Sequence, residues 1–382
     1  MKTVRLKGAE IPRSPRIFAK RLRRPEESVR PGEEVLVRAE DGTFVGRGFY
    51  SPRSVYGVRI YDRREKGPPL DGEWLAGRVR AAAALRREVL RLEDVTDAYR
   101  VVHAEGDGLS GLVVDRYADA AVVEVGARGI FERLDDLAEI LGTLLGVRTV
   151  VVRADPDVEE IEGFRVTDRR AEPVRVVVRE GPLRFHVDCR GGHKTGFFCD
   201  QRESRAEALR LAKGRRVLDL CCYTGGFALA AAKGGAREVK GVDLDEEAIA
   251  LARENAALNK LDVPFEHADA FDFLRAGPRA DLVILDPPKL AARREDLARA
   301  RRKSVDLNAL AFGALGPGGL LFTFSCTGLF SSEDFEAQVR EAAVRAGRDA
   351  SVVRVTGQPP DHPVDLLCPE TRYLSGLLVA VR

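Results

Sequence analysis

The sequence has little of what membrane, secreted and zinc-binding proteins depend on. No window of about 18 apolar residues occurs in the 382-residue chain, so we expect no membrane partner. The N-terminal charges are not followed by the apolar stretch of a secretory signal. The six cysteines show no paired CxxC spacing, and a chain of this length needs no disulfides to hold its core. We therefore expect reduced thiols, a cytoplasmic location and no metal site.

A single average core is also excluded by the length of the chain, and three domains are predicted. Residues 1–67 indicate a small β-rich domain, because Asp41-Gly42 is a hairpin-turn signal between two β-rich runs. Residues 71–185 indicate an α+β domain with the order αββαβ(β). Residues 186–382 alternate strands and helices as a parallel α/β sheet does, and an antiparallel pair is expected to close it.

Charge is unevenly distributed between the start of the chain and the middle. The first 25 residues contain nine Lys and Arg residues against the single acid Glu10. Such a run is typical of a nucleic-acid-facing surface or of a solvated arm, and Arg21, Arg23 and Arg24 are its candidate RNA contacts. The acidic segment 155–162 argues against a phosphate-binding surface over the whole central domain.

Candidate ligand-binding groups follow three successive strands of the last domain. The first strand leads into a turn with adjacent glycines at 225 and 226, which would admit a ligand to the backbone or simply pack tightly. Asp243 ends the second strand, where a carboxylate can accept both hydroxyls of a ribose. Asp269 follows the third and would accept from an adenine amino group or cap a helix. The GxGxxG spacing of dinucleotide sites is absent, which makes a nicotinamide oxidoreductase the least favoured function.

Two later strand ends carry groups that suit covalent chemistry on a base. Asp286 begins an Asp-Pro-Pro turn that two fixed φ angles stiffen, and Cys326 follows an apolar strand. A cysteine in a polar, partly exposed turn can be activated as a thiolate, whereas a buried structural cysteine is the alternative.

Three segments, 192–202, 222–227 and 324–326, resemble the bacterial ribosomal RNA large-subunit cytosine-5 methyltransferase family of class I S-adenosylmethionine-dependent enzymes. The resemblance implies a PUA-like RNA-binding domain, a central α+β domain and a C-terminal Rossmann-like methyltransferase domain. It implies that S-adenosyl-L-methionine is the cofactor and large-subunit ribosomal RNA the partner, and it raises a homodimer as a hypothesis. The residues that it places around the cofactor are Asp200, Gln201, Arg202, Tyr223, Gly225, Asp243, Asp269 and Asp286.

The same resemblance implies a mechanism. The Cys326 thiolate would add to cytosine C6, and Asp286 would hold the base at N3 or N4. The residues expected to contact the substrate are Pro287, Pro288, Lys289, Lys194, Arg21, Arg23 and Arg24. Lys289 and Leu290 follow the prolines where amino-methylating relatives carry an aromatic residue, which argues against an exocyclic nitrogen target.

Two further absences separate this chain from relatives of the fold. The second cysteine that many cytosine-5 RNA enzymes carry after this proline is missing, as it is in the family named, and the proton-abstracting base is left open. The family's Pro-Trp-Val-Phe-like segment lacks its tryptophan here, where Ser14-Pro15-Arg16-Ile17-Phe18 stands. The rival functions are an RNA guanine-N2 methyltransferase and a non-catalytic RNA-binding ribosome assembly factor.

Overall fold

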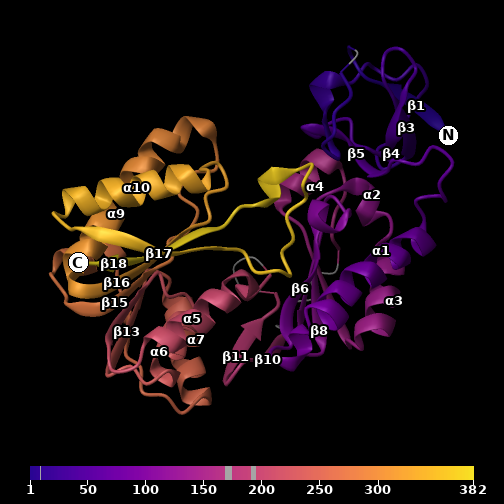
Figure 1. Ribbon diagram of the computed structural model, residues 1–382. Coiled ribbons are helices and arrows are strands. Elements are labelled where there is room, and N and C mark those ends of the chain that lie inside the picture. Colours follow the sequence, from indigo (N-terminus) through magenta and orange to yellow (C-terminus); the bar gives the residue numbers. More distant parts are fainter. Residues whose placement is uncertain (9, 168–173, 191–194) are drawn as a thin grey trace. The chain divides into compact units, whose positions relative to one another are not determined.

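The computed structural model describes residues 1–8, 10–167, 174–190 and 195–382 (Figure 1). The chain divides into two compact units. The first unit comprises Met1–Val178, Val187–Cys199 and Pro360–Thr371, and the second comprises Arg179–His186, Asp200–Pro359 and Arg372–Arg382. The three-domain bounds 1–67, 71–185 and 186–382 stay a prediction.

The first unit begins with a five-stranded sheet in the order β1-β3-β4-β5-β2. Its strands are β1 (Lys2–Arg5), β2 (Arg16–Phe18), β3 (Glu34–Arg38), β4 (Phe44–Tyr50) and β5 (Tyr56–Asp62). The predicted turn between β3 and β4 forms as expected: Gly42 has a φ of +90°, and the Thr43 N–H donates to Asp41 Oδ1 at 2.9 Å. Alternating buried residues such as Val35, Val37 and Val58 make the core of this sheet.

A four-stranded sheet in the order β6-β7-β8-β9 follows in the same unit, with helices packed on it. Its strands are β6 (Ala98–His103), β7 (Leu112–Tyr117), β8 (Ala120–Val125) and β9 (Thr149–Arg153), and its helices are α1 (Gly72–Ala84), α2 (Arg128–Phe131), α3 (Leu134–Leu145) and α4 (Pro156–Glu162). Helices α1 and α3 cover one face, and Figure 1 shows them side by side. The predicted order αββαβ(β) omitted β6, which carries Arg100 in its middle.

The acidic segment 155–162 is only partly a surface patch. It folds as α4, with Asp155 as its N-cap, and both Glu159 and Glu162 are buried. Glu162 accepts hydrogen bonds from Arg59 Nη1 at 2.9 Å and from Ser51 Oγ at 2.8 Å. Glu162 therefore neutralises the buried Arg59, whereas Asp155, Asp157 and Glu160 are exposed and keep part of the segment acidic at the surface, as expected.

A second buried network in the first unit uses charged residues that are far apart in sequence. Arg100 donates from Nε and Nη2 to the two oxygens of Asp115, each at 2.7 Å. Arg86 pairs with Asp107 at 2.5 Å and donates to the Asp361 carbonyl at 2.6 Å. The Asp361 carboxylate accepts from the Arg100 N–H at 3.0 Å. The segment Pro360–Thr371 is therefore held in the first unit by hydrogen bonds to charged partners.

The chain enters the second unit through β10 (Arg175–Glu180) and β11 (Leu183–Asp188), which pair as a two-stranded sheet. The main sheet of the second unit has seven strands in the order β14-β13-β12-β15-β16-β18-β17. They are β12 (Arg216–Leu220), β13 (Glu238–Asp243), β14 (Phe265–His267), β15 (Ala280–Leu285), β16 (Leu315–Ser325), β17 (Ala350–Gly357) and β18 (Ser375–Val381). The first five pair in parallel, and β18 pairs antiparallel with both β16 and β17, as predicted for the closing pair.

Helices cover both faces of this sheet, as a doubly wound fold requires. They are α5 (Arg202–Leu211), α6 (Gly226–Lys233), α7 (Glu246–Leu258), α8 (Ala270–Arg275), α9 (Leu297–Ala314) and α10 (Ser332–Arg345). Figure 1 shows α5, α6 and α7 on one face and α9 and α10 on the other. Buried side chains of β15, β16, α9 and α10 share one hydrophobic core. None of the helices that the structure describes is long and apolar enough to cross a bilayer.

Candidate active site

The predicted site residues of the second unit gather at one edge of the parallel sheet. Strand β12 lies between β13 and β15, so successive strands are added to one side of β12 and then to its other side. In sheets of this kind, ligands bind beyond the carboxyl ends of the strands on either side of the reversal. Asp243 is the last residue of β13, and the loops after β12, β14, β15 and β16 carry the predicted residues 223–225, 269, 286–289 and 326.

The turn after β12 is conformationally strained. Cys221, Tyr223 and Gly225 have φ angles of 59°, 49° and 82°, in the left-handed region that non-glycine residues rarely occupy. Asp243 holds this turn, because its Oδ2 accepts from the Tyr223 N–H at 2.8 Å and its Oδ1 from the Asp245 N–H at 2.9 Å. Each carboxylate oxygen retains a second lone pair, so Asp243 can still accept from a ribose hydroxyl. Strain of this kind is concentrated at ligand sites.

The adjacent glycines serve packing more than access. A Cβ at Gly225 would lie 2.7 Å from Phe265 Cζ, and one at Gly226 would lie 2.9 Å from Arg205 Cδ. Protein atoms, not open space, therefore lie beside both positions. Tight packing is therefore one reason for glycine at both positions, and the positive φ of Gly225 is another, while contact of Gly225 with the cofactor stays a prediction.

Asp269 caps the helix that follows it. Its Oδ1 accepts from the N–H groups of Phe271 at 2.8 Å and Asp272 at 3.2 Å at the start of α8. Helix capping, the alternative that the sequence allowed, is thus observed. A role toward an adenine amino group stays a prediction.

Asp219 is a site residue that the sequence interpretation missed. It lies in β12 with no exposed surface, and its Oδ2 accepts from the Ala228 N–H of α6 at 2.8 Å. Its Oδ1 is buried without a hydrogen-bond partner among the residues that the structure describes. Burial, opposed by that hydrogen bond and reinforced by the charges of Asp286 and Asp243, raises the pKa of Asp219 to about 8. The signal in the sequence was a carboxylate inside an otherwise apolar strand.

The segment 199–202 approaches the same strand ends through two hydrogen bonds. Gln201 Nε2 donates to Asp286 Oδ2 at 2.9 Å, and the Tyr373 hydroxyl donates to Asp200 Oδ2 at 2.7 Å. Asp200, Gln201 and Arg202 are all buried, and Arg202 begins α5. The sequence did not predict a role for Tyr373, because its partner Asp200 lies 173 positions away and no local pattern indicates the contact.

The predicted nucleophile and base acceptor lie on adjacent strands. β15 and β16 pair in parallel, so Asp286 and Cys326 follow neighbouring carboxyl ends. The half-buried Cys326 thiol donates to the Pro287 carbonyl at 3.8 Å, and the Leu290 N–H donates to Thr327 Oγ1 at 3.1 Å. The structure therefore brings the Cys326 turn and the Asp-Pro-Pro turn into direct contact.

The other thiols are unsuited to nucleophilic chemistry at neutral pH. Among the six cysteines, only Cys221 and Cys326 are not fully buried. Burial and the nearby charge of Asp243 raise the pKa of the Cys221 thiol. Burial also raises the pKa of Cys189 to about 12 and that of Cys368 to about 11. Protonated thiols are poor nucleophiles, which leaves Cys326 as the candidate.

The remaining predicted residues are dispersed. Pro287 is buried, whereas Pro288 and Lys289 are exposed beside Asp286. Lys194 lies outside the described residues. In the first unit, Arg21 pairs with Glu10 at 3.1 Å, Arg23 pairs with Glu40, and Arg24 is exposed. Two of the three predicted RNA-contacting arginines are thus already partnered by carboxylates.

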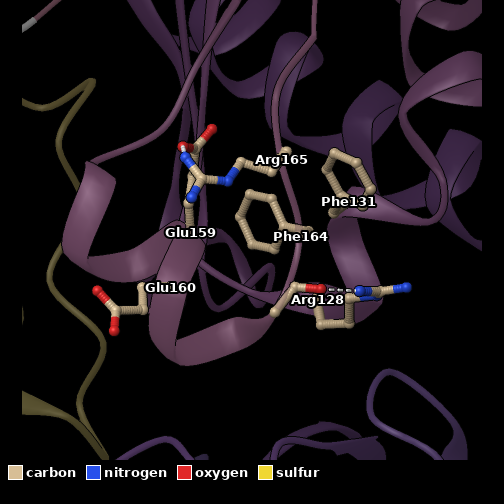
Figure 2. Close-up of a pocket in the computed structure, with 7 residues that line it drawn as sticks. Arg128, Phe131, Glu159, Glu160, Phe164 and Arg165 are labelled. Carbon is tan, nitrogen blue, oxygen red and sulfur yellow. Dashed lines mark hydrogen bonds and ion pairs between the residues drawn. The ribbon is translucent and has the colours of Figure 1, made fainter.

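One hollow in the first unit contains none of the predicted residues. It is lined by Arg128, Phe131, Glu159, Glu160, Gly163, Phe164 and Arg165. Figure 2 shows the rings of Phe131 and Phe164 facing each other, with centroids 4.5 Å apart and an interplanar angle of 17°. Arg128 donates to the Gly163 carbonyl beside them. Both arginines of the hollow are bonded within it, Arg128 to Gly163 and Arg165 to Glu159, which is typical of a structural crevice.

The strand-end cluster fits S-adenosylmethionine in charge and hydrogen-bonding capacity. The cofactor carries a sulfonium and an ammonium, and it is best met by acceptors and negative charge. The buried Gln201 Oε1 and Asp219 Oδ1 are acceptors without a partner among the described residues. The carboxylates of Asp219, Asp243 and Asp286 lie close enough to raise the pKa of Cys221 together.

Comparison with known proteins agrees with this geometry. Residues 167–366 match the family model of S-adenosylmethionine-dependent methyltransferases, and residues 12–63 match that of PUA-like domains. The chain is 38% identical over 393 residues to ribosomal RNA large subunit methyltransferase I of Aeromonas hydrophila, covering 99% of this chain and 98% of the relative. It is 39% identical over 379 residues to the protein of the same name from Tolumonas auensis, covering 96% and 95%.

A solved structure shows the same fold over the whole length. A chain from Streptococcus mutans, described as a SAM-dependent methyltransferase, superposes with a TM-score of 0.83 at 19% identity and covers 100% of both chains. The expected fold, a PUA-like domain followed by a Rossmann-like methyltransferase domain, is confirmed. A non-catalytic assembly factor is not what these similarities indicate. The chain belongs to the family of S-adenosylmethionine-dependent methyltransferases that includes ribosomal RNA large subunit methyltransferase I, and it is an enzyme.

Proposed function

We propose that this enzyme methylates C5 of a cytosine in large-subunit ribosomal RNA through a covalent adduct with Cys326. One observation carries the proposal: the partly exposed Cys326 thiol lies 3.8 Å from the Pro287 carbonyl, beside Asp286, at the carboxyl ends of two adjacent parallel strands. An amino-group methyltransferase needs no thiol at this position. The names of the relatives support ribosomal RNA as the substrate.

Cys326 supplies the covalent step. Its thiolate adds to C6 of the cytosine, and the electron pair of the C5–C6 double bond moves to C5, which becomes nucleophilic. Bound S-adenosylmethionine supplies the methyl group as an electrophilic carbon, which C5 takes as the carbon–sulfonium bond breaks. A base then removes the C5 proton, and those electrons restore the double bond as the C6–S bond breaks. Cys326 is returned as a thiolate.

Asp286 and Gln201 orient the base. A carboxylate can accept from the cytosine amino group at N4 or from a proton at N3, where charge changes when the thiolate adds. Gln201 donates to Asp286 Oδ2 at 2.9 Å, which helps to fix the orientation of the carboxylate toward the base. Gln201 thus acts through Asp286 as a positioning residue.

Replacing Cys326 tests the mechanism. We expect Cys326→Ala to lower turnover by about a thousandfold or more, because the covalent route is lost. RNA that contains 5-fluorocytosine should form a stable conjugate with the unmodified enzyme and none with the variant, because fluorine at C5 cannot leave as a proton. The control Cys368→Ala removes a different thiol, one in the first unit, and should retain both turnover and conjugate formation. Turnover of Cys326→Ala near that of the unmodified enzyme would indicate guanine-N2 methylation.

Bisulfite sequencing of ribosomal RNA identifies the product. In a strain that lacks the gene, we expect one 5-methylcytosine of the large-subunit RNA to disappear. Reintroduction of the unmodified gene should restore it, and the gene with Cys326→Ala should not. Loss of a methylated guanine instead would contradict the proposal.

A homodimer and a cytoplasmic location are also proposed. Strand β17 forms one edge of the seven-stranded sheet, and Val352, Val353 and Val355 on it are 44%, 60% and 62% exposed. An exposed apolar edge strand offers unpaired backbone groups to a second copy of itself. Sedimentation equilibrium of the unmodified protein and of Val353→Lys measures this: a dimer that the lysine dissociates is expected, and a monomer in both would overturn it.

A further inference from the structure

The N-terminal sheet carries aromatic side chains at its surface that its fold does not use. Phe18 ends β2 and is 42% exposed, and it pairs in register with Tyr56 at the start of β5. The two ring centroids are 5.1 Å apart at an interplanar angle of 52°. Val55, the next residue along the chain before Tyr56, is 66% exposed. A group of large apolar side chains left in water marks a surface for a partner.

Two cations flank these rings. The Arg16 guanidinium lies 4.9 Å from the centroid of the Tyr56 ring, and Lys20 Nζ lies 5.6 Å from that of Phe18. Arg16, Phe18, Lys20 and Tyr56 therefore form a row of cation, ring, ring and cation, which we name the aromatic platform. Arg16 is also paired with carboxylates, whereas Lys20 forms no ion pair among the described residues.

We propose that the aromatic platform binds an unpaired nucleotide of the RNA substrate, with the base stacked on Phe18 and a neighbouring phosphate against Lys20. The proposal rests on the proposed RNA substrate and adds how the first unit recognises it. A base has a flat face of the same kind as the Phe18 ring, and stacking tolerates any base. The faces of paired bases are covered by their neighbours in a duplex, so only an unpaired nucleotide can stack here.

Charge argues for a nucleic acid as the partner. Three of the four platform residues lie within the first 25 residues, where nine basic residues accompany the single acid Glu10. Arg21 and Arg23 are engaged by Glu10 and Glu40, so phosphate contacts fall to the cations that these carboxylates do not hold. An anionic membrane would also meet rings and cations, but only Phe18 and Val55 of this group are exposed apolar side chains, which is little to insert.

The test compares a short single-stranded RNA with an abasic strand of the same length, which keeps the phosphates and lacks the bases. Binding to the full-length protein is followed by fluorescence anisotropy over a range of salt concentrations. We expect Phe18→Ala to weaken binding of the RNA by about 5- to 150-fold, the range that loss of one stacked base gives, and to leave binding of the abasic strand unchanged. The slope of log K against log salt should not change, because no phosphate contact is removed.

Matched variants keep folding defects apart from loss of stacking. Ile161→Ala truncates a side chain of similar exposure, 43%, in the same unit and should bind RNA as the unmodified protein does. Phe18→Trp keeps a ring and should retain affinity. Lys20→Ala should weaken both strands equally and flatten the salt slope.

Three outcomes would overturn the platform. In the first, Phe18→Ala and Ile161→Ala lose the same RNA affinity. In the second, Phe18→Ala loses as much affinity for the abasic strand as for the RNA. In the third, Phe18→Ala keeps its RNA affinity but loses affinity for vesicles of anionic phospholipid. Methylation separates this proposal from the previous one. If the unmodified enzyme forms 5-methylcytosine and Phe18→Ala raises neither the KM for RNA nor the dissociation constant, only the platform fails. If the unmodified enzyme forms none, the proposed function fails.

Discussion

Two aspartates, one in each unit, are buried to the same degree but differ in the hydrogen-bond partners of their carboxylates. Asp115 on β7 and Asp219 on β12 each have no exposed surface. Asp115 receives two hydrogen bonds from Arg100 and one from Thr195, so its charge and lone pairs are matched by partners. Asp219 receives one backbone N–H, and burial raises its pKa to about 8. Burial alone therefore does not tell a structural aspartate from a candidate ligand-binding one, whereas the hydrogen-bond partners of the carboxylate do.

The difference reflects what each unit has to do. In the first unit, buried charges join β6, the helical turn Leu85–Val89 after α1 and the segment 360–371 into one structure, and a missing partner would be costly. In the second unit, a carboxylate that the protein leaves incompletely bonded is an acceptor available to a cationic ligand. Once ionised, Asp219 would offer such an acceptor to the ammonium or sulfonium of S-adenosylmethionine.

The largest effect on stability is expected at Asp115. Asp115→Ala leaves the Arg100 guanidinium buried without its carboxylate, which should lower the free energy of unfolding by about 3–5 kcal/mol. Urea unfolding followed by circular dichroism measures the change. Asp119→Ala, which removes a half-exposed carboxylate two residues beyond β7, should cost about 1 kcal/mol or less. Equal losses for the two variants would show that the Arg100 pair is not a structural requirement.

Asp219→Asn should instead raise the free energy of unfolding, by an amount that depends on pH. Because the folded-state pKa of about 8 lies above the unfolded value of about 3.9, the stability that Asp219 contributes is complete below about pH 4 and is lost as pH rises through about 8. Asn mimics the protonated acid at every pH. The variant should therefore match the unmodified protein near pH 4 and exceed its free energy of unfolding by about 2–4 kcal/mol near pH 9.

The control for this measurement is Asp281→Asn, which changes an exposed carboxylate of the same unit. Its stability should follow the pH dependence of the unmodified protein. Calorimetry with S-adenosylmethionine supplies the functional half, because Asp219→Asn should bind the cofactor about tenfold more weakly or worse. Parallel stability curves for Asp219→Asn and the unmodified protein would mean that the pKa of Asp219 is not raised.

Local patterns explain which parts of the sequence were predictable. The alternation of strands and helices over residues 186–382 was predictable because the signals that begin and end a helix lie within a few positions of it, as the N-cap Asp245 does before α7. Strand β6 was missed because Arg100 interrupts its apolar pattern, and the carboxylate that neutralises it lies 15 positions away. The strand-end aspartates followed from the spacing of the βα units. Tyr373 and its bond to Asp200 could not be predicted, because only the folded chain brings them together.

Asp361 offers an intermediate case. Its carboxylate accepts from the Arg100 N–H at 3.0 Å inside the first unit. Asp361→Ala should leave that N–H without its acceptor and lower the free energy of unfolding by about 1–3 kcal/mol. The affinity for S-adenosylmethionine measured by calorimetry should stay unchanged. A loss of affinity without a loss of stability would place Asp361 with Asp219.

The smallest effect on stability is expected at the exposed pair of Arg23 and Glu40. Their side chains are 53% and 48% exposed, so water screens the attraction and Arg23→Ala should change the free energy of unfolding by about 0.5 kcal/mol or less. RNA affinity distinguishes the arginines more sharply. If Glu40 occupies Arg23, then Arg24→Ala should reduce the slope of log K against log salt by about one unit, and Arg23→Ala by less. Equal slopes for both variants would show that RNA displaces Glu40, and that an ion pair in the free protein does not remove an arginine from the binding surface.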